Sequence, residues 1–102
     1  MSLIIDKIVF ISEDVFKVRI DSVLRKLGII DIICYKDWMN IGLRGDEAGI
    51  RIDYPDDLDY LSYAVEEEVR FQTSYYESNI QTIKGYFSEN LEQIKSALKQ
   101  IK

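Results

Sequence analysis

A long series of regularly spaced apolar positions runs through the second half of the chain. Between Leu58 and Ile101, apolar residues recur at steps of three and four, and only Gln72 interrupts the series. This spacing places side chains on one face of an α-helix. We call these positions the C-terminal stripe; its members are Leu58, Leu61, Val65, Val69, Tyr76, Ile80, Ile83, Phe87, Leu91, Ile94, Leu98 and Ile101.

The C-terminal stripe is long enough for one helix or for two. At about 100° per residue its direction is kept across Gln72 and Gly85, which favours one helix. However, residues 72–74 and 78–79 are weak helix formers, and Ser74 followed by Glu77 has the spacing of a capping box. A single helix of about 45 residues would be about 68 Å long, against a radius of gyration near 13 Å for a compact chain of this length. We therefore predict two helices, with a break between residues 72 and 79.

A second apolar line accompanies the first part of this helical region. Tyr60, Ala64, Phe71 and Tyr75 share a side away from the C-terminal stripe, and Tyr86 extends the line if the helix continues. A helix covered on one side needs only one apolar face. We therefore expect this region to be covered by the sheet plus the last helix, or by the sheet plus another copy of the chain.

The first 28 residues predict a strand followed by a helix. The apolar, β-branched segment from Leu3 to Ile11 is typical of a strand, and Ser12-Glu13-Asp14 has the composition of a helix N-cap with an acidic first turn. Gly28 suits the C-terminal end of that helix. The apolar positions that indicate the helix are Phe16, Ile20, Val23 and Leu27.

Residues 29–54 lose helical periodicity and predict two or three antiparallel strands. Ile29 to Tyr35 is a β-prone run, and apolar residues alternate with other residues from Met39 to Arg44 and again from Ile50 to Tyr54. The glycine-containing segment Gly45 to Gly49 is expected to form the loop of a hairpin, and Pro55 to end the last strand.

These elements together predict one α+β domain over residues 1–102. It has two layers: a small antiparallel sheet, with one N-terminal helix and one long or two consecutive C-terminal helices. Residues 1–55 form the strand-helix-strand part, and residues 56–102 the helical part, which starts at an Asp56 or Asp57 cap. A length of 102 residues and an apolar content of 47% suit a single small core.

The net charge of −5 is concentrated in one segment. Residues 53–77 hold eight acidic side chains and one basic one, Arg70, whereas residues 1–52 are balanced. An acidic surface disfavours contact with a nucleic-acid backbone, and no apolar run approaches the roughly 18 residues of a membrane span. We expect no direct binding of nucleic acid or membrane.

Candidate chemical groups do not converge on an enzyme site. Asp53, Asp56, Asp57 and Asp59 crowd one turn, but their spacing matches no calcium loop, and helix capping accounts for most of them. The chain has no histidine for a cysteine or serine nucleophile, and its glycines do not match a phosphate-binding loop. We predict no catalytic residue, no cofactor and no metal site.

Two further residues have ordinary structural interpretations. Cys34, the only cysteine, lies among apolar neighbours and is expected to be a buried thiol, which fits a reducing, cytoplasmic location; no signal peptide is recognisable. Trp38 with Tyr35 offers rings that can stack on a base, but packing in the core or an interface is the stronger interpretation.

The predicted function is a non-enzymatic protein–protein interaction module that forms a homodimer. The residues assigned to self-association are Ile83, Phe87, Leu91, Ile94 and Leu98. The alternative is an inhibitor or immunity-type protein whose acidic residues 53–77 block a basic or nucleic-acid-binding partner. The residues assigned to that acidic and aromatic surface are Tyr60, Glu66, Glu67, Glu68, Phe71 and Tyr75.

Overall fold

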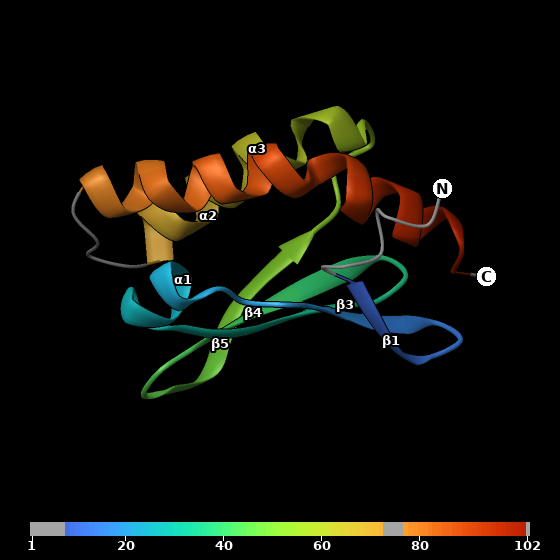
Figure 1. Ribbon diagram of the computed structural model, residues 1–102. Helices are drawn as coiled ribbons and strands as arrows, with labels where there is room; N and C mark the ends of the chain where they lie inside the picture. The colour runs from blue at the N-terminus through green and yellow to red at the C-terminus, as the bar shows by residue number, and fades with distance from the viewer. Residues whose placement is uncertain (1–7, 73–76, 102) are drawn as a thin grey trace.

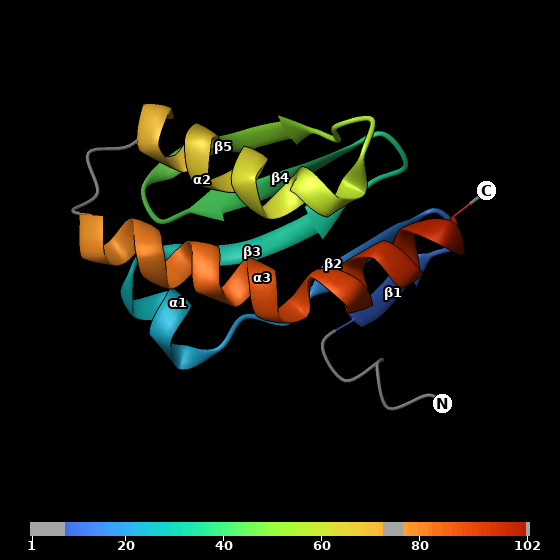
Figure 2. The same cartoon turned by 90° about the horizontal axis from the view of Figure 1, so that it is seen from above.

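The computed structural model describes residues 8–72 and 77–101. Figure 1 shows two layers, an antiparallel sheet and two long helices packed on one of its faces. The helices α2, Leu61–Gln72, and α3, Glu77–Lys99, lie side by side, with α2 over the β5 side of the sheet and α3 over the β1 side (Figure 2). The predicted α+β class with a small antiparallel sheet is therefore confirmed.

Within the described residues, the sheet is a meander of five strands in the order β1-β2-β3-β4-β5. Each strand pairs antiparallel with the next, so every connection is local. The strands are β1 Ile8–Ser12, β2 Val15–Val18, β3 Ile29–Cys34, β4 Trp38–Leu43 and β5 Asp46–Asp53.

The N-terminal helix is present but shorter than the sequence pattern predicts. Helix α1 spans only Ser22–Lys26 and is capped by Asp21, whose side chain accepts a hydrogen bond from the Leu24 amide at 3.0 Å. Ser12 does not cap a helix, because it ends β1 and bonds to Asp14 in the turn before β2. The expected first half of the helix is instead the strand β2, which pairs with both β1 and β3.

The loop between β4 and β5 is also tighter than expected. The turn occupies residues 44–45, and β5 already begins at Asp46. Gly45 has φ +80°, and Gly49, within β5, has φ +69° where the β4–β5 register shifts. A Cβ on Gly49 would lie 2.7 Å from the Ile41 carbonyl oxygen, so this bulge requires glycine.

The described part of the helical half contains two helices, as predicted. A short 3₁₀ turn, η2, Leu58–Tyr60, precedes α2 and is capped by Asp57, which accepts from the Asp59 amide at 2.9 Å. Helix α2 ends at Gln72 and α3 begins at Glu77. The proposed capping residue Ser74, like Tyr75 and Tyr76, falls outside the described residues.

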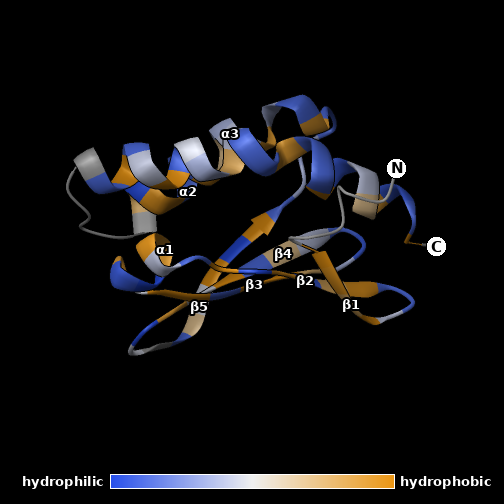
Figure 3. Cartoon of the chain, in the orientation of Figure 1, coloured by the Kyte–Doolittle hydropathy of each residue, from blue (hydrophilic) through white to orange (hydrophobic). Residues whose placement is uncertain are grey.

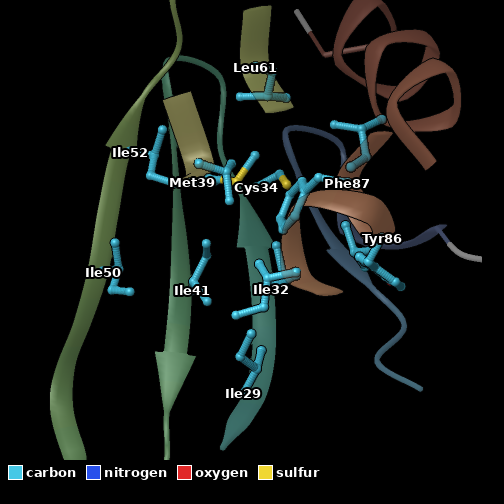
Figure 4. Packing of buried hydrophobic residues seen from close by; sticks show 14 of the residues in the cluster. Ile29, Ile32, Cys34, Met39, Ile41, Ile50, Ile52, Leu61, Tyr86 and Phe87 are labelled. Carbon is cyan, nitrogen blue, oxygen red and sulfur yellow. The ribbon is translucent and has the colours of Figure 1, made fainter. Parts of the chain in front are cut away.

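The core lies between the helices and one face of the sheet. Figure 3 shows hydrophobic positions gathered on the strands and on the sides of the helices that face them. In the close view of Figure 4, Phe87 from α3 and Leu61 from α2 lie over Ile32, Cys34 and Met39 of the sheet. The stripe residues that are buried here are Leu61, Val65, Val69, Ile80, Ile83, Phe87 and Ile94.

Candidate protein-interaction surface

Helix α2 carries two apolar faces, of which one is buried and the other is exposed. Leu61, Val65 and Val69 are at most 1% exposed and pack on the sheet. On the other side, Tyr60 is 64% exposed, Tyr63 55% and Phe71 84%. We call Tyr60, Tyr63, Glu67 and Phe71 the aromatic face, because helical spacing places these exposed residues on one outward side.

The three consecutive glutamates of α2 have three different environments, since consecutive helix residues point about 100° apart. Glu66 is only 9% exposed and bridges α2 to α3, with its carboxylate 3.0 Å from Arg70 and 3.1 Å from Lys84. Glu67 is exposed, and Glu68 is half-buried. They do not form a paired acid and base.

Hydrogen bonds shift the pKa values of two side chains on this helix, Glu66 and Tyr63. The hydrogen bond from Lys84, reinforced by Arg70, holds the pKa of Glu66 below its ordinary value of 4.5. Glu67 accepts a hydrogen bond from the Tyr63 hydroxyl at 3.0 Å, which raises the pKa of Tyr63. Glu66 is therefore ionised, and Tyr63 is neutral, at neutral pH.

Glu67 stands between two hollows in the surface. One has a volume of about 440 Å³ and lies on the aromatic face; it is lined by Tyr63, Glu66, Glu67, Arg70 and Phe71. The other has a volume of about 210 Å³ and lies where α2 meets β5; it is lined by Arg51, Ile52, Asp53, Ala64, Glu67 and Glu68. Both hollows combine carboxylates with apolar or backbone surface, which is a surface suited to cationic side chains with long apolar stems.

The aspartates before α2 are engaged within the chain. Asp57 caps η2, Asp53 pairs with Arg51 at 3.2 Å, and Asp59 accepts a short hydrogen bond from Lys95. The Lys95 hydrogen bond lowers the pKa of Asp59. Within residues 8–72 and 77–101, no group of three or more histidine, cysteine, aspartate or glutamate side chains is arranged to hold a metal ion.

Cys34 is fully buried beneath the helices, and its burial raises the pKa of the thiol to about 12. A thiol that stays protonated and covered is not a nucleophile. The Trp38 ring lies on the sheet face opposite the helices, stacked on Tyr35 at 4.3 Å between ring centroids, with the Arg51 guanidinium 4.2 Å from its centroid. The two rings therefore pack on each other on the open face of the sheet and are not part of the core.

The residues predicted to join two copies of the chain lie in the core or pack against it, not on the surface. Ile83, Phe87 and Ile94 have no exposed surface, and Leu91 and Leu98 are partly buried against the same core. The chain's own sheet already covers this set, so its side chains offer little exposed surface to a second copy.

The acidic and aromatic set is placed as predicted in part. Tyr60, Glu67 and Phe71 are exposed, and Glu68 is half-buried beside β5. Glu66 was assigned to the surface and instead joins the two helices; Tyr75 lies outside the described residues. Sequence reasoning missed Tyr63, although its spacing of three from Tyr60 and four from Glu67 could have identified it.

No protein-family model matches the sequence, and the comparisons with curated proteins and with solved structures return no match. Among the helices of the described ranges, none is both long and apolar enough to cross a membrane.

Proposed function

We propose that this chain is a non-enzymatic protein–protein interaction module that binds a basic partner through the aromatic face and the adjacent carboxylates Glu67 and Glu68. The observation that supports this most is the exposure of Tyr60, Tyr63 and Phe71 beside the Glu67 carboxylate, which accepts a hydrogen bond from Tyr63. Aromatic residues are enriched at protein interfaces, where they supply apolar anchors.

In the isolated chain, the aromatic face exposes apolar surface that a bound partner could bury. Full burial of a phenylalanine side chain is worth roughly 1.5–3 kcal/mol, and Phe71 is 84% exposed. The carboxylates around it supply the second component, because complementary charge steers association and selects partners. Anchor and charge together favour a partner that presents lysine or arginine next to apolar side chains.

Self-association is the second candidate, and it stays a prediction. A two-fold contact through the aromatic face would bring the same residues of both copies together. Glu67 and Glu68 would then oppose their own equivalents, and like charges in an interface are unfavourable. The geometry therefore favours a basic partner over a second copy at this surface.

Selection from a library of random displayed peptides tests the proposed partner chemistry. Peptides selected on the wild-type protein should be enriched in lysine and arginine, and the enrichment should disappear on Glu67→Lys/Glu68→Lys and weaken on Phe71→Ser. Glu13→Lys/Glu89→Lys is the matched control, because it changes the net charge equally at two exposed positions away from the aromatic face.

The proposal fails if wild-type protein selects no basic peptides, or if the enrichment persists unchanged on the α2 variants. Sedimentation of the wild-type protein addresses the second candidate. A mass of 12.0 kDa at all concentrations would remove self-association, and a doubled mass that survives Phe71→Ser would place it on another surface.

A further inference from the structure

Strand β5 forms one border of the sheet, directly beside the aromatic face. It is the last strand in the order β1-β2-β3-β4-β5, and no described strand pairs with its outer side. Figure 2 shows β5 at this border, with α2 running alongside it on the helical layer. An edge strand offers backbone donors and acceptors to a partner strand.

The register identifies which β5 residues point their backbone outward. The Tyr54 amide donates to the Asp37 carbonyl at 3.3 Å, so Tyr54 faces β4. Backbone direction alternates along a strand, and β4 and β5 pair regularly from Trp38↔Asp53 to Ile41↔Ile50. Arg51 and Asp53 therefore direct their N–H and C=O groups away from the sheet.

The hollow at the junction of α2 and β5 lies against these same residues. It is bounded by Arg51, Ile52 and Asp53 below and by Ala64, Glu67 and Glu68 above. The small Ala64 side chain leaves the space, and the two glutamates place carboxylates over it. A strand added beside Arg51–Asp53 would point every second side chain toward these carboxylates.

We infer that the outer edge of β5 accepts an extended, basic segment of a partner protein as a sixth strand, with a lysine or arginine of that segment entering the hollow beneath Glu67 and Glu68. This inference rests on the proposed function and specifies the conformation of the bound partner. Strand addition supplies affinity through main-chain hydrogen bonds, and side-chain pockets supply specificity.

Charge decides which strand is accepted. A second copy of β5 would bring its own Glu67 and Glu68 toward the Glu67 and Glu68 of the first copy, so like charges disfavour edge-to-edge pairing of two copies. A basic strand meets the opposite situation, since Glu67 and Glu68 place two carboxylates at the hollow, while the Arg51 guanidinium pairs with Asp53 and lies against Trp38 on the other face of the sheet.

A synthetic peptide of alternating lysine and valine is the probe, and its binding is followed by fluorescence anisotropy. The same peptide with N-methyl groups on alternate amides cannot form a full strand ladder and should bind at least about tenfold more weakly, since it loses main-chain hydrogen bonds to β5. In the wild-type complex, the amides of Arg51 and Asp53 should exchange hydrogen more slowly than in the free protein.

Arg51→Pro tests the edge on the protein side, with Arg51→Ala as its control. Both variants remove the guanidinium, but only proline removes the outward N–H; proline is tolerated at such an edge position. We expect the peptide to bind Arg51→Ala and to bind Arg51→Pro at least about tenfold more weakly than Arg51→Ala. Far-ultraviolet circular dichroism checks that both remain folded, and the amide exchange at Asp53 gives a reading that does not need a variant.

The outcomes separate this inference from the proposed function. If the lysine–valine peptide binds equally to Arg51→Pro and Arg51→Ala, or leaves the Arg51 and Asp53 amides unprotected, the sixth strand is refuted. If a helical lysine–alanine peptide then binds, and its binding is lost on substitution of Glu67, the proposed function holds without the sixth strand. If neither peptide binds the wild-type protein, both are refuted.

Discussion

The two faces of helix α2 differ in chemistry as well as in burial. The inner face is aliphatic, with Leu61 and Val65 fully covered by the sheet. The outer face is aromatic and charged, with Phe71 84% exposed and Glu67 beside it. Both faces satisfy helical periodicity, so the periodicity identifies apolar faces without saying which of them the chain itself covers.

The difference follows from the packing needs of each face. Aliphatic side chains interdigitate with the β-branched residues of a sheet and have no polar atom to satisfy. Tyrosine carries a hydroxyl that needs a partner, and Tyr63 finds one in Glu67 on the outer surface. An aromatic and acidic face is therefore better suited to a solvated surface than to the protein interior.

The largest expected effect is the difference in stability between substitutions of two phenylalanines, one buried and one exposed. Phe87→Ala should lower the free energy of unfolding by about 3–5 kcal/mol, because Phe87 is fully buried under α3. Phe71→Ala should change it by no more than about 0.5 kcal/mol, because the side chain is exposed. Denaturant titration followed by circular dichroism measures both.

The outcome that breaks the comparison is a large loss at both positions. Equal destabilisation would mean that the outer face of α2 is covered in solution, either within the chain or by another copy. If Phe87→Ala does not fold at all, Phe87→Leu gives a smaller and measurable loss, and the contrast with Phe71→Leu is preserved.

The fold was predictable where one local pattern excluded the others. The helical half, its division into two helices and strands β3 to β5 all follow from periodicity and turn residues. Strand β2 did not, because Phe16 and Ile20 fit a helical spacing while Phe16 and Val18 also fit an alternating one. Pairing with β3, Phe16↔Cys34 among others, decides between them, and no local window contains that partner.

The interaction surface was predictable to a similar extent. Exposed Tyr60 and Phe71 were assigned to a surface, but the self-association residues were not recognised as core, since a five-stranded sheet wide enough to cover both helices needs β1 and β2 as separate strands. Glu66 was misplaced for a related reason. Its partner Lys84 comes from α3, and only the antiparallel packing of the two helices brings them together.

A smaller effect separates two tyrosines. Tyr86 is 7% exposed, and its hydroxyl donates to the Arg19 carbonyl, which ties α3 to the segment before α1. Tyr86→Phe should lower the free energy of unfolding by about 1 kcal/mol, whereas Tyr60→Phe should change it by only a few tenths of a kcal/mol. Thermal unfolding of the two variants beside the wild type measures the difference.

The ionisation of the Tyr86 phenol gives a second measurement, which does not depend on unfolding the protein. Burial raises the pKa of Tyr86 to about 12, so its phenol should still be neutral at a pH where an ordinary phenol in water has ionised. Spectrophotometric titration of wild type against Tyr86→Phe should show one late-ionising group missing. An unchanged late titration would mean that Tyr86 is not one of the late-ionising phenols.

The smallest expected effect distinguishes the neighbouring glutamates Glu66 and Glu67. The hydrogen bond from Lys84 lowers the pKa of Glu66 in the folded state, so the ionised carboxylate stabilises the fold above its ordinary pKa of 4.5. That stabilisation is lost as the pH falls through the lowered folded pKa, where Glu66 becomes protonated. Glu66→Gln should therefore be less stable than the wild type at pH 7, and the gap should close in acid. Glu67→Gln is the matched control, because it removes a carboxylate at an exposed position and should change the free energy of unfolding at pH 7 by no more than about 0.5 kcal/mol. Urea unfolding across the acidic range gives the curves, and a gap at Glu66 that stays constant with pH would show that packing of the side chain, rather than its charge, joins α2 to α3.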